Sequence, residues 1–274
     1  MSTIITGENG YIASHLKAVI KDARCISFRN GADGVDLTDD DVLIHCAAIV
    51  HKKEKDYADF YDRVNYIEAV KLAKKAKENG VSHFVFMSTM SVYGIKCGVI
   101  DKNTPCNPIS LYGKSKLSAE NEIMAMGDEN FTVTVLRPPM VYGPDCPGNF
   151  ALLKSLALAV PVFPKVANKR SMIYVTNLAY AVKMILDDKI SGIILPMDKE
   201  YVNTSDMVKK ISDAVGKRLI LSNFMGKIAA SIPLGIFQKV FGSLCYDKDS
   251  AMLCDRISFD EAIKQCVADD AKQS

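Results

Sequence analysis

The stretch ITGENGYIASHL, residues 5–16, joins a short apolar run to a helical pattern, and this stretch decides the fold. Gly7 and Gly10 allow the backbone to turn tightly after a strand and to approach a phosphate group closely. Ala13 stands where a small side chain permits close packing between helix and strand. Because the free N–H groups of a helix N-terminus bind anions, the stretch predicts a turn that holds the pyrophosphate of a dinucleotide. The expected cofactor contacts of this turn are Gly7, Asn9, Gly10, Tyr11 and Ile12.

The rest of the chain alternates between β-rich apolar runs and helical patterns. The expected strands are residues 3–6, 25–28, 42–48, 83–89, 131–139 and 191–197, and the expected helices between them are 10–22, 60–80, 111–126 and 178–188. This order predicts an α/β fold, a Rossmann-type doubly wound parallel sheet with helices on both faces. From about residue 146 the pattern changes and predicts a smaller, mostly helical C-terminal lobe that binds substrate. The expected boundaries are 1–145 plus about 173–197 for the dinucleotide-binding domain, and about 146–172 plus 198–274 for the lobe.

Composition excludes several classes of function. The net charge of +2 over 274 residues gives no strong field for nucleic acid. The eight cysteines form no C-x-x-C pair and the four histidines show no ligand spacing, so reduced thiols are expected rather than disulfides or a metal site. The N-terminus lacks a signal-peptide pattern, and no apolar run is long enough to span a membrane. We therefore expect a cytoplasmic protein without an integral membrane span. Residues 227–244 are apolar but interrupted by Pro233 and by lysines, which leaves peripheral membrane contact open.

The ends of the second and third expected strands indicate how the adenosine half of the cofactor is held. A carboxylate after the second strand would favour NAD(H), but this chain has Arg29 there and no acidic residue. Arg29 suits a 2′-phosphate, so NADP(H) is favoured, with NAD(H) as the alternative. Asp36 and Leu37 are expected at the edge and face of the adenine. Ala47 and Ala48 are small residues at the end of the third strand, where a cofactor passes over the sheet.

Six motifs follow one another in a fixed order along the chain. They are TG-x-x-G-x-x-A, H-x-A-A-x-x-H, the helix with Asn65, MSTMSVYG, YGKSK and RPPMVYGP. Taken together they are similar to those of extended short-chain dehydrogenases/reductases of the NAD-dependent epimerase/dehydratase family, and the resemblance covers nearly the whole chain.

This resemblance implies a catalytic set of Thr89, Tyr112 and Lys116. Tyr112 would be the acid/base, Lys116 would assist it and bind the nicotinamide ribose, and the Thr89 hydroxyl would hydrogen-bond the reacting sugar oxygen. Tyr112 and Lys116 are one turn apart and share a helix face. A tyrosine that acts as a base near pH 7 needs its pKa to fall by about 3. The lysine ammonium and the positive nicotinamide ring are expected to cause that fall by stabilising the phenolate.

Further residues take their expected roles from the same resemblance. Asn65 is placed near the active site, with a purely structural role as the alternative, and Pro139 is placed near the nicotinamide. Met90 and Ser91 stand at substrate-binding positions where the family's dehydratases have an Asp-Glu pair, so dehydration is not expected. Met140 replaces an asparagine of typical epimerases.

One branch of the family, the bacterial nucleotide-sugar 4-ketoreductases, resembles this chain best. In that branch Asn149 and Arg170 would hold the substrate diphosphate, a role that suits a guanidinium. The alternatives are a helix cap for Asn149 and a surface charge for Arg170. The leading hypothesis is reduction of a UDP-4-keto-6-deoxy-N-acetylhexosamine for surface polysaccharide synthesis. A UDP-hexose 4-epimerase and a non-catalytic dinucleotide-sensing protein are the alternatives. The family often forms homodimers.

Overall fold

The computed structural model describes residues 2–37, 42–50, 54–231 and 240–268. The chain divides into two compact units. Unit 1 comprises Met1–Gly94, Pro105–Pro138 and Leu178–Pro196, and unit 2 comprises Ile95–Thr104, Pro139–Asn177 and Met197–Ser274. His51, the last residue of the H-x-A-A-x-x-H motif, lies outside the described residues, as does part of the apolar stretch 227–244.

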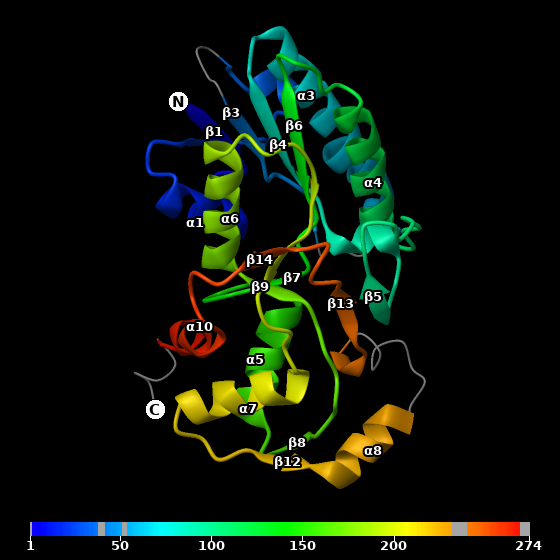
Figure 1. The fold of residues 1–274 in the computed structure, drawn as a ribbon, viewed down its shortest axis with the longest axis vertical. Coiled ribbons are helices and arrows are strands. Elements are labelled where there is room, and N and C mark those ends of the chain that lie inside the picture. Colours follow the sequence, from blue (N-terminus) through cyan, green and yellow to red (C-terminus); the bar gives the residue numbers. More distant parts are fainter. Residues whose placement is uncertain (1, 38–41, 51–53, 232–239, 269–274) are drawn as a thin grey trace. The chain divides into compact units, whose positions relative to one another are not determined.

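Unit 1 is built on a six-stranded parallel sheet (Figure 1). Its strands are β1 (Thr3–Thr6), β2 (Arg24–Ile26), β3 (Val42–His45), β4 (His83–Met87), β6 (Thr132–Leu136) and β10 (Gly192–Ile194). They lie in the order β10-β6-β4-β3-β1-β2. The chain therefore leaves β1 in opposite directions to reach β2 and β3, and such a reversal creates a crevice at the carboxyl ends of the strands.

Helices cover both faces of this sheet. They are α1 (Tyr11–Val19), α2 (Glu54–Phe60), α3 (Glu68–Glu78), α4 (Leu111–Met124) and α6 (Val175–Asp187), with short 3₁₀ turns η1 (Ala32–Gly34) and η3 (Met90–Tyr93) and a π-helix η2 (Tyr61–Ile67). Figure 1 shows α1 and α6 on one side of the strands and α3 and α4 on the other. Apolar residues of the sheet, such as Phe84 and Phe86, pack against Leu72 of α3 and Ile123 of α4 to form the core. The expected Rossmann-type architecture is confirmed.

Unit 2 mixes short strands with helices. Its strands are β5 (Gly98–Ile100), β7 (Met140–Tyr142), β8 (Val162–Pro164), β9 (Met172–Tyr174), β11 (Pro196–Asp198), β12 (Ile220–Ser222), β13 (Leu244–Tyr246) and β14 (Met252–Cys254), and its helices are α5 (Asn149–Ala159), α7 (Thr204–Ala214), α8 (Asn223–Ser231) and α10 (Phe259–Cys266). The strands pair as β7-β9, β8-β12, β5-β13 and β11-β14. Unit 2 is thus less helical than the sequence predicts, because three-residue strands carry too little periodicity to be recognised.

Two of these pairs explain why unit 2 takes in more of the chain than the sequence-based boundaries give it. Residues 95–104 join unit 2 because β5 pairs in parallel with β13, with Gly98 opposite Leu244. Residues 139–145 join it because β7 pairs with β9, with Met140 opposite Met172.

Candidate active site

The turn after β1 has the backbone that the glycine pattern predicts. Gly7 has a φ of +87°, and its N–H donates to the carbonyl of Ile26 at 2.9 Å. A Cβ at Gly7 would lie 3.2 Å from the Cα of Ala47, and one at Gly10 would lie 2.9 Å from the Gly7 carbonyl oxygen. Glycine is therefore required at both positions. Gly10 is the N-cap of α1, so the backbone N–H groups of Tyr11 and the next residues have no acceptor within the helix. They face the turn, and free N–H groups at a helix N-terminus bind anions.

The residues expected around the adenosine differ in exposure. Arg29 and Asp36 are exposed, while Leu37 is buried in the core of unit 1. Ala47 and Ala48 follow β3 and are half-buried. The Ala47 N–H donates to the Thr6 hydroxyl at 3.3 Å, which joins the loop after β3 to the end of β1.

Asn65 lies in the π-helix and is fully buried. Its Oδ1 accepts from the Ile49 N–H at 2.7 Å, and its Nδ2 donates to the Ile49 carbonyl at 3.0 Å. Nδ2 also lies 3.5 Å from the hydroxyl of Ser115, which donates to the carbonyl of Tyr112 at 3.0 Å. Asn65 thus ties the loop after β3 to the first turn of α4. π-helical segments occur often at functional sites.

Thr89, Tyr112 and Lys116 all belong to unit 1. Thr89 precedes η3, and its Oγ1 accepts from the Ser91 N–H at 3.1 Å, so Met90 and Ser91 form the start of that turn. Burial raises the pKa of Tyr112 to about 12, a hydrogen bond with Thr89 opposes the rise, and Tyr61 adds to it. We expected Lys116 to lower the pKa of Tyr112, but Lys116 is not among the causes of the shift. The largest cause is burial of the phenol, which raises the pKa.

Lys116 is a buried ammonium, 1% exposed, on the helix that carries Tyr112. Its Nζ lies 4.1 Å from the ring centroid of Phe86 and has no hydrogen-bond partner among the described residues. Burial lowers the pKa of Lys116 to about 8, against the opposing fields of Cys46 and Glu120. A buried ammonium without an acceptor is costly, so this atom fits a cofactor whose hydroxyl groups accept from it.

A buried ion pair holds the segments that carry these three residues. Arg137 follows β6, and its Nε and Nη2 donate to Oε2 of Glu120 at 3.0 and 2.6 Å. Its Nη1 donates to the Tyr93 hydroxyl at 2.9 Å, and the Ser88 hydroxyl donates to the other oxygen of Glu120. Ser88 precedes Thr89, Tyr93 ends η3, and Glu120 lies one turn beyond Lys116. We call these four residues the Arg137 cluster.

The sequence analysis missed this cluster, although one signal was present. Glu120 lies four residues after Lys116, on the helix face that carries Tyr112 and Lys116. An acidic residue at that position is expected to pair with a basic side chain. Arg137 is the first residue of the motif RPPMVYGP, and nothing in that motif indicates its partner. Its separation of 17 residues from Glu120 gives no local indication of the pair.

Asn149 and Arg170 belong to unit 2, as does Pro139. Gly148, with a φ of +84°, occupies the cap of α5, so the alternative that Asn149 caps this helix is wrong. Asn149 is instead the exposed first residue of α5. Arg170 is half-buried, its Nη1 donates to the Gly242 carbonyl at 2.8 Å, and burial lowers its pKa.

The family model described as the NAD dependent epimerase/dehydratase family matches residues 3–194. The matched segment contains the glycine turn, Thr89 and the Tyr112–Lys116 helix. This chain belongs to the NAD-dependent epimerase/dehydratase family.

Two curated proteins are similar to this chain over part of their length. UDP-glucose 4-epimerase of Vibrio cholerae is 32% identical over 189 residues, which are 64% of this chain and 57% of that protein. N-acetyl-alpha-D-glucosaminyl-diphospho-ditrans,octacis-undecaprenol 4-epimerase of Escherichia coli O157:H7 is 27% identical over 207 residues, 73% of this chain and 60% of that protein. The matched segments therefore span less than two thirds of each relative's length.

Solved structures share the fold of this epimerase/dehydratase family member. UDP-glucuronic acid 4-epimerase from Bacillus cereus in complex with NAD has a TM-score of 0.76 at 20% identity and covers 100% of this chain and 99% of its own. RMD from Pseudomonas aeruginosa complexed with NADPH has a TM-score of 0.75 at 16% identity, with coverages of 100% and 99%. Neighbours of this fold thus bind NAD or NADPH, and the preference of this chain stays a prediction.

The described part of the chain contains no membrane-spanning helix and no cluster of metal-ligating side chains. No helix there has the length and apolar character to cross a membrane. No group of three or more His, Cys, Asp or Glu residues there is arranged to hold a metal ion. The homodimer and the cytoplasmic location stay predictions.

Proposed function

We propose that this chain catalyses oxidoreduction at C4 of a nucleotide-diphospho-sugar with a nicotinamide dinucleotide. The observation that carries the proposal is the Tyr112–Lys116 pair, a half-buried phenol and a buried ammonium one helical turn apart in the unit that contains the glycine turn. The Lys116 Nζ has no protein acceptor among the described residues, and a ribose diol would supply one. Gly7, Gly10 and the amides of Tyr11 and Ile12 would hold the pyrophosphate.

The chain's own residues would transfer one proton to or from the C4 oxygen of the sugar. The Tyr112 phenolate takes it from the C4 hydroxyl during oxidation, or the Tyr112 phenol donates it to the C4 oxygen during reduction, while the Thr89 hydroxyl hydrogen-bonds the same oxygen. With the cofactor bound, Lys116 would be expected to favour the phenolate of Tyr112, because an ammonium stabilises a nearby negative charge. When bound, the nicotinamide ring supplies the hydride acceptor or donor. In unit 2, Asn149 and Arg170 are the candidates for the substrate diphosphate.

The leading reaction is 4-epimerisation. It is supported by the two relatives, whose names are those of 4-epimerases. In this reaction C4 is oxidised to a ketone and then reduced from its other face, so the cofactor is regenerated in every cycle. Tyr112 would act as base in the first half and as acid in the second.

Net reduction of a 4-ketosugar is the second candidate, and one feature of the chain favours it. Arg29 is exposed in the turn after β2, where a 2′-phosphate is expected, which favours NADP(H). Dehydration is disfavoured because Met90 and Ser91 supply no carboxylate.

One experiment separates these two reactions. The purified protein is denatured and its bound nucleotide identified, and the native protein is then assayed with UDP-glucose and, separately, with NADPH and a UDP-4-ketosugar. A 4-epimerase is expected to retain NAD and to form UDP-galactose without net NADPH use. Stoichiometric NADPH consumption with the ketosugar and no UDP-galactose would replace epimerisation by reduction. No turnover in either assay would contradict the proposal.

A further inference from the structure

The segment from β12 to α8 in unit 2 exposes a cluster of large apolar side chains. Phe224 is 73% exposed, Ile220 53%, Ile228 46% and Met225 38%. We call these four residues the α8 surface. Single exposed apolar residues are normal on a protein, but four within nine consecutive positions form a patch, and such patches mark interaction sites.

The packing of α8 explains why these residues face outward. Gly226 is buried, and a Cβ at this position would lie 1.9 Å from the carbonyl oxygen of Lys165, so only glycine allows the close approach of α8 to the segment after β8. In a helix with 3.6 residues per turn, Phe224 and Ile228 lie one turn apart on a face nearly opposite Gly226. The contact at Gly226 therefore directs Phe224 and Ile228 away from unit 2.

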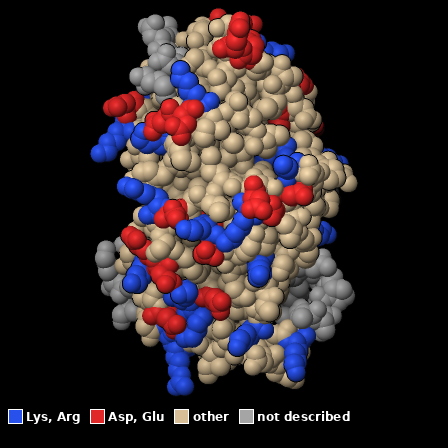
Figure 2. Space-filling view, in the orientation of Figure 1, with Lys and Arg blue, Asp and Glu red and all other residues tan. Residues whose placement is uncertain are grey.

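The chain segments that form the α8 surface and the neighbouring loop after β8 carry charges of one sign. Lys217, Arg218 and Lys227 lie within the same stretch, and Lys165 faces α8 from the segment after β8. Residues 214–241 contain no Asp or Glu, and neither do residues 146–186. Figure 2 shows blue side chains on tan, without red, at the lower right of the visible face, where α8 lies in Figure 1.

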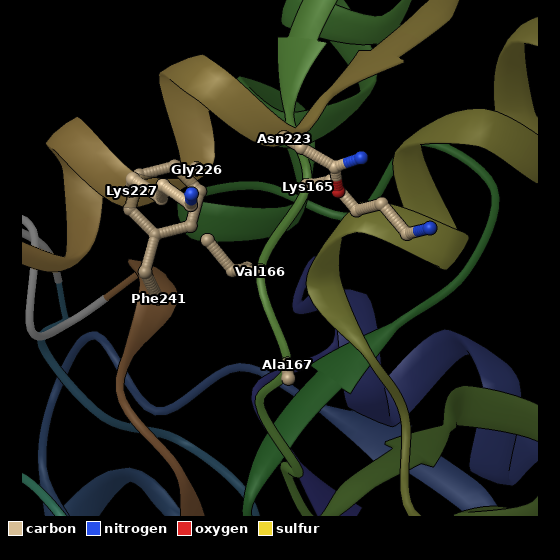
Figure 3. A pocket seen from close by; sticks show the side chains of 7 residues that line it. All are labelled: Lys165, Val166, Ala167, Asn223, Gly226, Lys227 and Phe241. Atoms are coloured by element: carbon tan, nitrogen blue, oxygen red, sulfur yellow. The ribbon is translucent and has the colours of Figure 1, made fainter.

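A cavity of about 580 Å³ lies beside α8 and brings two of these cations together with an aromatic ring. In Figure 3, Lys227 and Phe241 lie on one side of it and Lys165 and Asn223 on the other. Lys165 and Lys227 are exposed and form no ion pair with any residue that the structure describes. Both ammonium groups are thus available to an anionic partner.

We propose that the α8 surface docks this chain on an anionic lipid bilayer. Phe224, Met225 and Ile228 would enter the interfacial layer, and Lys165, Arg218 and Lys227 would lie at the level of the lipid phosphates. Large apolar side chains beside cations, in chain segments without an acidic residue, are the arrangement that a negatively charged interface requires. Because the surface is small, binding is expected to be reversible and sensitive to salt.

Co-sedimentation of the full chain with vesicles tests this proposal without any turnover. The protein is expected to pellet with vesicles of phosphatidylcholine and phosphatidylglycerol, to stay in solution with phosphatidylcholine alone, and to be released by high salt. Phe224→Ser and Lys227→Glu are each expected to reduce the bound fraction several-fold, and the double variant to abolish binding. Since both side chains are exposed, the melting temperature and the activity on soluble nucleotide-sugars should stay unchanged.

Val99→Ser and Lys199→Glu are matched controls, because both residues are exposed in unit 2 outside the α8 surface. Both controls should bind vesicles like the parent chain. The proposal fails if the parent chain does not pellet with anionic vesicles, or if Phe224→Ser binds as well as the parent. It also fails if UDP displaces the chain from vesicles more strongly than sodium chloride of equal ionic strength, which would assign the lysines to a soluble phosphate. Conversion of a dimer to a monomer by Phe224→Ser would instead assign the surface to a second copy of the chain.

Discussion

Two buried carboxylates, one in each unit, are held in different ways. Glu120 in unit 1 is 1% exposed and meets the guanidinium of Arg137 through two hydrogen bonds. Asp198 in unit 2 is 7% exposed, and among the described residues it accepts only from neutral groups, which are the Tyr142 hydroxyl, the Tyr174 N–H and the Asn177 amide. The first carboxylate is balanced by a full charge and the second is not.

This difference has a functional meaning. A buried ion pair adds little to stability compared with an apolar pair of the same volume, because both charges lose their hydration. Its directional bonds instead fix one arrangement of the segments that it joins. The Arg137 cluster joins the end of β4, η3 and α4, which carry Thr89, Tyr112 and Lys116. The Asp198 network joins β7, β9, α6 and β11, none of which carries a residue assigned to catalysis.

The largest effect is expected from Arg137→Met. This change leaves the Glu120 carboxylate buried without its partner, so the free energy of unfolding should fall by about 3–5 kcal/mol. Turnover should fall as well, because η3 and α4 lose their link. Urea unfolding and steady-state kinetics measure both quantities. Lys77→Met, which breaks the partly exposed pair with Asp128 in the same unit, should cost less than about 1 kcal/mol.

The double variant Glu120→Gln/Arg137→Met sharpens this test. With both charges removed, much of the stability lost in Arg137→Met should return, while turnover should stay low because the directional bonds are absent. Recovery of turnover together with stability would show that the pair has no role in positioning the site.

The second effect concerns the dependence of stability on pH through Asp198. Burial raises the pKa of this carboxyl from 3.8 to about 6, against its hydrogen bonds to Asn177, Tyr142 and Tyr174. Between these values the folded chain binds more protons than the unfolded chain, so this group lowers stability as the pH rises through the window. The loss approaches about 3 kcal/mol above the folded pKa, an order-of-magnitude value from 1.36 kcal/mol per pKa unit.

Asp198→Asn should remove this slope. Measured by urea unfolding, the difference in stability between the variant and the parent should move in favour of the variant as the pH rises from about 4 to about 6. Asp187→Asn, at an exposed residue paired with Lys183, is the control and should show no such trend. A difference that stays constant with pH would mean that Asp198 is already ionised throughout this window.

The smallest effect is expected from Tyr93→Phe, which removes only one hydrogen bond of the Arg137 cluster. The free energy of unfolding should fall by about 1 kcal/mol, the usual net contribution of such a bond. Turnover should fall only a few-fold, with KM unchanged. A larger loss of turnover than in Arg137→Met would contradict the order proposed for the cluster.

The contrast between the two carboxylates also explains what the sequence predicted. The glycine turn and the Tyr112–Lys116 pair were recognisable because their chemistry requires fixed spacing within one turn or one helix. The Asp198 network could not be predicted from the sequence, because its members come from separate elements. Tyr142 and Asp198, for example, are 56 residues apart. The positive φ of Gly148, which makes this glycine rather than Asn149 the cap of α5, is likewise a property of the folded backbone.

The most direct test of the central claim is the turnover of Tyr112→Phe on the substrate that the parent chain converts, followed by NMR at the sugar C4 position. Loss of the phenol hydroxyl should lower kcat by roughly 10²- to 10⁴-fold, the range for a lost general acid or base. The melting temperature and the bound cofactor should stay as in the parent. A Tyr112→Phe variant with the parent's kcat would contradict the assignment of Tyr112 as the acid/base under both epimerisation and reduction.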